Sequence, residues 1–188
     1  MDRSEIIHKI IEFTDLAHGS QTRKYTPDRY IVHPIRVMET CREYTDKLPV
    51  LAAAILHDVI EDTPLLPHDI SQFLKGLMSN DDRNLTIQLV KELTDVYMKK
   101  DFPHFNRYTR KRMELERLRK ISGDAQTIKY ADILDNSIEI PQHDLSFAKR
   151  YLTECRDILL ALDKGNLQLR QRAITLVNKE LENVEQQS

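Results

Sequence analysis

Glycine is scarce in this chain of 188 residues, which has only four glycines, no two of them within forty positions of each other. They are Gly19, Gly76, Gly123 and Gly165. This spacing excludes the dinucleotide-binding fingerprint and the P-loop, because both need clustered glycines to bring backbone N–H groups onto a phosphate. It also excludes collagen-like, low-complexity and linker-rich chains. Any phosphate chemistry must therefore depend on side chains or on a bound metal.

Cysteine, long apolar runs and an excess of one charge are scarce as well. The two cysteines, Cys41 and Cys155, give no disulfide framework and are typical of a reducing cytoplasm. The longest apolar run, 48–56, has nine residues and contains Pro49, so we expect no membrane span. The net charge is −2, from 28 basic and 30 acidic residues, so a nucleic-acid partner is not expected.

Helical periodicity of apolar residues dominates the chain, and no Asn-Gly or Asp-Gly turn separates two alternating runs. The chain is 40% hydrophobic and long enough for one core, so we predict a single all-α domain over 1–188. The segment 49–62, nearly all apolar until His57, should be its central buried helix, and Gly19 should close the first helix. Helices are expected at 6–17, 34–41, 49–62, 69–75, 84–97, 124–139, 147–162 and 166–182.

Four ionisable residues end the apolar segment: His57, Asp58, Glu61 and Asp62. In a continuous helix His57 stacks over Glu61 and Asp58 over Asp62, because positions four apart share a face. Three crowded carboxylates beside a core are unfavourable, and a bound cation would offset that cost. An imidazole next to a carboxylate also suits a divalent metal. For the His57-Asp58 pair alone, the alternative is a helix C-terminus with solvated acids.

Three residues elsewhere strengthen the metal interpretation. His33 precedes Pro34 at a predicted helix start, where a rigid turn can fix a ligand. Asp132 lies between apolar residues on another predicted helix, and Asn136 is one turn beyond it on the same face. Two histidines and two aspartates from three helices could form one metal site inside a helical bundle. Such a set leaves open positions on a six-coordinate ion for a water and for a phosphate oxygen.

These residues lie in segments that resemble the HD superfamily of metal-dependent phosphohydrolases. The likeness is greatest to the hydrolase domain of RelA/SpoT-type alarmone enzymes and their small single-domain relatives. It extends over about residues 5–140, and the helices at 145–185 are expected to pack on that region. The pair Glu61-Asp62 is the most specific feature, because general HD phosphohydrolases lack it. The matching segments are Ala17–Lys24, Tyr30–Val37, Ala53–Thr63 and Ile128–Asp132.

The resemblance implies a compact, all-helical HD-domain bundle with a buried metal site. It implies hydrolysis of the 3′-pyrophosphate of guanosine tetra- or pentaphosphate, (p)ppGpp, by a metal-activated water. The implied cofactor is Mn²⁺, with other transition metals as alternatives. The implied metal ligands are His33, His57, Asp58 and Asp132. Glu61 and Asp62 would position or deprotonate the water, while Arg23, Lys24 and Asn136 would bind the nucleotide.

The chain departs from the family pattern after the fourth implied ligand. A histidine of the family is replaced by Asp135, and a later arginine and threonine are replaced by Ile138 and Glu139. The loop 25–29 also lacks the usual glycine. Two alternatives therefore stay open: an HD-type nucleotidase or pyrophosphohydrolase acting on a different nucleotide, and a non-catalytic nucleotide-sensing module.

The segment 99–120 is basic, with nine Lys or Arg residues against three Asp or Glu residues. It is either a solvated helix face with local ion pairs, a surface that attracts the polyanionic substrate, or a nucleic-acid contact. His18 is either structural or close to the site. The sequence indicates no particular oligomeric state.

Overall fold

The computed structural model describes residues 2–187, which contain helices and no strand. The prediction of an all-α fold is confirmed. An isolated antiparallel bridge pairs Thr22 with Arg29 in the loop after the first helix. The chain divides into two compact units, Met1–Thr94 and Asp95–Ser188. One domain over 1–188 stays a prediction.

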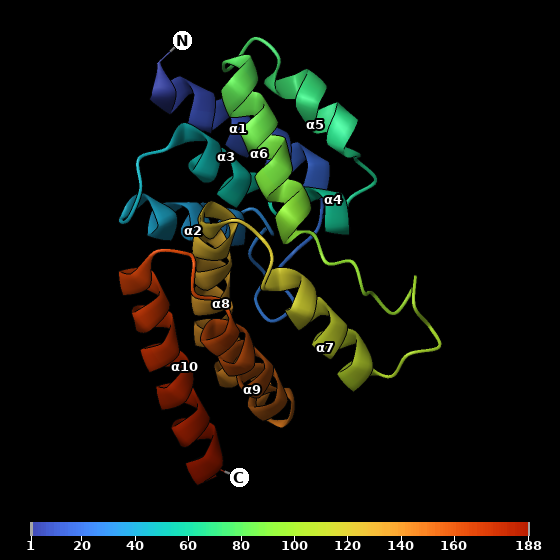
Figure 1. Ribbon diagram of the computed structural model, residues 1–188, viewed down its shortest axis with the longest axis vertical. Helices are drawn as coiled ribbons and strands as arrows, with labels where there is room; N and C mark the ends of the chain where they lie inside the picture. The colour runs from blue at the N-terminus through green and yellow to red at the C-terminus, as the bar shows by residue number, and fades with distance from the viewer. Residues whose placement is uncertain (1, 188) are drawn as a thin grey trace. The chain divides into compact units, whose positions relative to one another are not determined.

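The first unit is organised around a short apolar helix. Helix α3 packs against α1, α2 and α6, and every residue from Pro49 to Leu56 is buried, as predicted for the central helix (Figure 1). Helix α1 starts in a capping box between Asp2 and Glu5, and it ends at Gly19, whose φ of 58° suits glycine. The unit contains α1 (Arg3–His18), α2 (Val32–Arg42), α3 (Leu48–Leu56), α4 (Val59–Asp62), α5 (Pro67–Leu74) and α6 (Asn80–Leu93).

The expected continuous helix from Pro49 to Asp62 is wrong. Helix α3 ends at Leu56 and α4 begins at Val59, so His57 and Asp58 occupy a break between them. Asp58 has φ −95° and ψ −6°, between the helical and extended regions, and its carbonyl accepts both Glu61 N and Asp62 N. The bond from Asp62 N to Asp58 O spans four residues as in a regular helix, so helical hydrogen bonding resumes at Asp58.

Helices α1, α2, α5 and α6 of the first unit all begin earlier than expected. Helix α2 begins at Val32, so Pro34 is its third residue, a position whose N–H has no partner within the helix. His33 therefore lies inside the first turn. Helix α6 begins at Asn80, because the Ser79 side chain accepts from Asp82 N as the N-cap.

The second unit is a packed group of longer helices. Helices α8, α9 and α10 contact one another and α7 packs on α9. The Tyr130 ring is fully buried, and its hydroxyl lies 2.9 Å from the Leu162 carbonyl and 3.1 Å from Gln126 Oε1. The unit contains α7 (Arg107–Leu118), α8 (Gly123–His143), α9 (Leu145–Ala161) and α10 (Leu167–Gln187).

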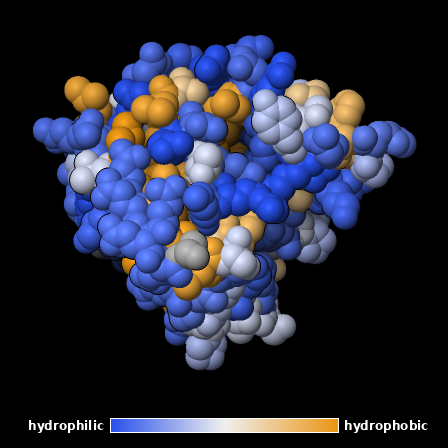
Figure 2. All heavy atoms as spheres, turned by 90° about the horizontal axis from the view of Figure 1, so that it is seen from below, coloured by the Kyte–Doolittle hydropathy of each residue, from blue (hydrophilic) through white to orange (hydrophobic). Residues whose placement is uncertain are grey.

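Several basic side chains of the segment 99–120 pair with neighbouring acids. Arg119 forms an exposed local pair with Glu116, as the solvated-face interpretation predicts, whereas the pair of Arg117 with Glu114 is mostly buried and differs from it. Lys111 pairs with Asp95 at 3.3 Å. Figure 2 shows one face of the molecule as mostly hydrophilic, with apolar residues scattered across it. Among the described residues, no helix is both long and apolar enough to cross a membrane.

Candidate metal centre

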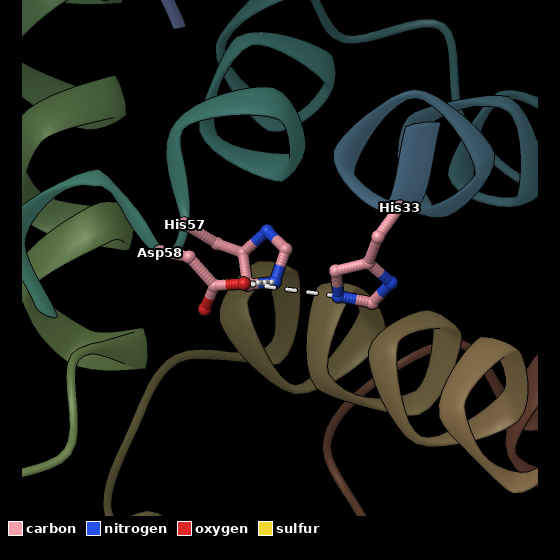
Figure 3. Close-up of side chains that lie close together, drawn as sticks. All are labelled: His33, His57 and Asp58. Atoms are coloured by element: carbon pink, nitrogen blue, oxygen red, sulfur yellow. Dashed lines mark ion pairs between the residues drawn. The ribbon is translucent and has the colours of Figure 1, made fainter. Parts of the chain in front are cut away.

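Three predicted ligands converge in the first unit. His33 lies in the first turn of α2, His57 directly follows α3, and Asp58 directly precedes α4. Each offers one ligand atom, and these atoms all lie within 4.8 Å of one another. Figure 3 shows the two imidazole rings and the Asp58 carboxylate turned toward a common point. Two adjacent residues, whose side chains a regular helix separates by about 100°, therefore offer ligand atoms to one place at the break between α3 and α4.

The contacts within this group are close. His57 Nε2 lies 3.0 Å from Asp58 Oδ2, and His33 Nε2 lies 3.7 Å from the same oxygen. The His33 side chain is 1% exposed and that of His57 5%, whereas that of Asp58 is 20% exposed. The imidazoles are thus enclosed by protein, and the carboxylate faces the accessible side of the group.

A hydrogen bond to the backbone sets the tautomer of the neutral His57 ring. Its Nδ1 lies 2.8 Å from the Ala54 carbonyl oxygen, which can only accept, so Nδ1 carries the hydrogen. In the neutral ring Nε2 then presents a lone pair toward Asp58 Oδ2, which is also an acceptor. The two atoms can lie 3.0 Å apart only with a proton or a cation between them.

The donor set fits a divalent metal. Metal-to-ligand distances near 2 Å place neighbouring ligand atoms about 3 to 4 Å apart, which matches the two contacts to Asp58 Oδ2. Imidazole nitrogen with carboxylate oxygen suits first-row transition ions. The bond from His57 Nδ1 to a carbonyl is the arrangement commonly found behind a metal-bound histidine.

The two predicted catalytic acids follow the group within one turn. Glu61 is half-buried and Asp62 is exposed, both on α4. Asp62 Oδ2 accepts from Gln21 Nε2 at 3.3 Å, which links this acid to the loop that follows α1. Two carboxylates therefore lie close in the chain to the candidate ligands, one of them in a defined hydrogen bond.

The predicted nucleotide-binding pair lies in the loop after α1. Arg23 is buried, and its guanidinium carbon lies 5.7 Å from the centre of the Tyr30 ring. Lys24 is exposed and donates to the Tyr25 hydroxyl at 2.7 Å. Arg23 N also donates to Asp28 O, which closes the loop beside the Thr22–Arg29 bridge.

Asp132 and Asn136 belong to the second unit, on α8. Asp132 is buried, and its two carboxylate oxygens accept from Lys129 Nζ at 2.8 Å and from Asn136 Nδ2 at 2.7 Å. The shared helix face predicted for Asp132 and Asn136 is thus confirmed by a direct hydrogen bond. The role of Asp132 as a fourth metal ligand stays a prediction.

Tyr30 contacts the group and had no predicted role. Its hydroxyl donates to Asp58 Oδ2 at 2.5 Å, and its ring lies 4.5 Å from the His18 ring. His18 in turn lies 2.8 Å, through Nδ1, from Gln21 Oε1. Only its position in the sequence could have pointed to Tyr30, because it is the first residue of the segment Tyr30–Val37, which resembles the HD family and contains His33.

Comparison with known proteins gives the class to which this architecture and site belong. Residues 30–137, more than half of the chain, match the HD domain family, and the chain belongs to this family. One relative is the Drosophila melanogaster guanosine-3′,5′-bis(diphosphate) 3′-pyrophosphohydrolase MESH1, 34% identical over 132 residues. Those residues cover 67% of this chain and 64% of MESH1, less than two thirds of the fly protein.

Two further relatives agree with this family. The bifunctional (p)ppGpp synthase/hydrolase SpoT of Escherichia coli (strain K12) is 45% identical over 56 residues, which are 30% of this chain and 8% of SpoT. A solved structure of a metazoan SpoT ortholog, reported to hydrolyse ppGpp and to play a role in starvation responses, matches with a TM-score of 0.73 and 25% identity. That match covers 97% of this chain and 94% of the other. The resemblance to RelA/SpoT-type HD proteins is confirmed.

Proposed function

We propose that this chain is a metal-dependent hydrolase that releases the 3′-pyrophosphate of (p)ppGpp. The observation that carries the proposal is the His33, His57 and Asp58 group, with Glu61 and Asp62 in the following turn. The likeness to MESH1 and to the SpoT ortholog supports the choice of substrate. The two buried free cysteines support a reducing, cytoplasmic setting.

The proposed cofactor is Mn²⁺, held by His33, His57 and Asp58, with Asp132 as the predicted fourth ligand. Two nitrogens and a carboxylate oxygen form a borderline donor set, which other transition ions can also use. Metal analysis of the purified protein, followed by stripping and reloading with single ions, would identify the ion that restores activity. Asp132→Asn should lower the metal content of the loaded protein if Asp132 is a ligand.

The chemistry follows from charge and proton transfer. When bound, a divalent ion supplies positive charge that polarises the phosphate and lowers the pKa of a nearby water. Glu61, half-buried, would accept the proton of the attacking water, and Asp62, held by Gln21, would orient that water. The water oxygen bonds to the phosphorus attached to the ribose O3′, the bond from that phosphorus to O3′ breaks, and O3′ takes up a proton. The products are pyrophosphate and the nucleoside 5′-diphosphate from ppGpp or 5′-triphosphate from pppGpp.

The proposed substrate contacts are Arg23, Lys24 and Asn136. The guanidinium of Arg23, already over one aromatic ring, suits stacking on a base. The Lys24 ammonium, exposed on the same loop, suits a phosphate or a polar base edge. Asn136 is proposed to contact the ribose.

Conservative replacement of the two acids tests the mechanism. Glu61→Gln and Asp62→Asn keep the shape of each side chain and remove its charge, so pyrophosphate release should fall about 100-fold or more. A matched control is Glu12→Gln, an exposed acid on α1 that pairs with His8 and should retain full activity. Full activity in the variant that carries both changes would disprove these roles.

A hydrolase for another nucleotide is the second candidate. Asp135 is buried where the family commonly has a histidine, so the surroundings of Asp132 differ from the family pattern. A panel of pyrophosphorylated nucleotides with different bases would decide between the two. Rapid release from another nucleotide without turnover of ppGpp would replace the first proposal.

A further inference from the structure

The Tyr30 hydroxyl donates a hydrogen bond to Asp58 Oδ2, the oxygen that both histidines of the candidate metal centre face. It donates to Asp58 Oδ2 at 2.5 Å, and this oxygen is the one that faces His57 Nε2 at 3.0 Å and His33 Nε2 at 3.7 Å. An aspartate carboxylate turns readily about its last side-chain bond. A hydroxyl fixed on one oxygen restricts that rotation and keeps the oxygen toward the two imidazoles.

The backbone of Tyr30 contacts a second candidate ligand. The Tyr30 carbonyl accepts from His33 N at 3.0 Å, in the turn that leads into α2. One residue therefore bonds the main chain of His33 and the side chain of Asp58. Because the side chain and the backbone make separate bonds, loss of the hydroxyl alone leaves the turn before α2 intact.

The Tyr30 ring is itself held by the loop after α1. It lies 4.5 Å from the His18 ring, and the guanidinium carbon of Arg23 is 5.7 Å from its centre. His18 is buried and is fixed by Gln21, the residue that also donates to Asp62. These neighbours hold the ring, and with it the hydroxyl, in place before a metal binds. Metal binding therefore needs little further loss of side-chain entropy at Tyr30.

We propose that Tyr30 is a positioning residue that fixes Asp58 for metal binding. The proposal rests on the proposed metal-dependent function and adds a residue outside the predicted ligand set. Hydrogen bonds behind a ligand orient it and raise metal affinity, and their loss commonly weakens binding about 10- to 100-fold. Tyr30 acts here through Asp58, and no step of the reaction is assigned to its hydroxyl.

The test is Mn²⁺ affinity, measured by calorimetric titration of metal-stripped protein without any nucleotide. Tyr30→Phe removes one hydroxyl and keeps the ring against His18, so we expect the Kd for Mn²⁺ to rise at least tenfold. The melting temperature of the metal-free variant should match that of the wild type. Tyr25→Phe is the matched control, because that hydroxyl lies in the same loop and bonds Lys24, and its Kd should be unchanged.

The same substitution in a protein that also carries Asp58→Ala shows whether the Tyr30 hydroxyl acts through the Asp58 carboxylate. In Asp58→Ala, Tyr30→Phe should weaken the remaining Mn²⁺ binding no further, because the two effects share one path. An unchanged Kd in Tyr30→Phe would overturn the positioning role and leave the proposed hydrolase standing, whether or not the melting temperature falls. Absence of any Mn²⁺ binding to the wild type would overturn both.

Discussion

The Nδ2 of Asn136 donates to Oδ1 of Asp132 at 2.7 Å, across one turn of α8. Lys129 Nζ bonds the other carboxylate oxygen of Asp132 at 2.8 Å from the preceding turn. Both carboxylate oxygens of Asp132, the predicted ligand in the second unit, are therefore held by residues of its own helix. This arrangement parallels the Tyr30–Asp58 bond of the first unit.

Replacing Asn136 should affect both metal and substrate binding. Asn136→Ala frees one oxygen of Asp132, so Mn²⁺ affinity should fall several-fold, and loss of the proposed ribose contact should raise KM for ppGpp about tenfold at saturating Mn²⁺. Asn183→Ala is the control, because it removes a similar amide–carboxylate bond, to Glu180 on α10. An unchanged KM at saturating metal would exclude the ribose contact.

Replacement of Gly165, which lies next to the Tyr130 ring, by a larger residue should destabilise the fold. A Cβ added at Gly165 would lie 2.4 Å from Tyr130 Cε2 and 2.9 Å from Thr127 N, and the ring is fully buried. Gly165→Ala should lower the free energy of unfolding by about 1–3 kcal/mol, the usual effect of overpacking. Urea denaturation measures this change. Asp163→Ala, at an exposed site nearby, should change it by less than about 0.5 kcal/mol, and equal effects would contradict the steric explanation.

The buried thiol of Cys155 should make stability depend on alkaline pH. Burial raises the pKa of Cys155 to about 12, above the ordinary value of 9.0. Between these values the thiol of the unfolded chain loses its proton and that of the folded chain keeps it. The free energy of unfolding is therefore unaffected by this thiol below about pH 9 and decreases as the pH rises toward 12.

Comparison of two pH values isolates this effect. From pH 9 to pH 10.5 the thiol should lower the free energy of unfolding by about 2 kcal/mol, and this part of the decrease should vanish in Cys155→Ala. Each protein serves as its own reference, so the altered packing of the variant cancels. Identical pH dependence in Cys155→Ala and the wild type would rule out the contribution of the thiol.

The sequence predicted the features that depend on local pattern. The apolar run at Pro49–Leu56 identified the buried central helix, and Gly19 marked the end of α1 because a left-handed residue there favours glycine. Residue type and motif grouped four ligands, and the structure brings three of them together, His33, His57 and Asp58, while the place of Asp132 in the group stays a prediction.

The features that were missed depend on contacts between distant residues or on small backbone distortions. The Tyr30–Asp58 bond joins residues 28 positions apart, and no periodicity encodes such a pair. The break at His57-Asp58 was missed because hydrophobic pattern reports which residues are buried and does not report a change of ψ at one residue. The start of α6 was placed four residues too late, because the Ser79 cap was overlooked.

The most direct test of metal-dependent 3′-pyrophosphate hydrolysis is the product formed from ppGpp by dialysed, metal-free protein before and after addition of Mn²⁺. The proposed function predicts no turnover before addition, and afterwards pyrophosphate and GDP in equal amounts. In ¹⁸O-labelled water the label should enter the pyrophosphate. Release of orthophosphate, or no turnover with any divalent ion, would contradict it.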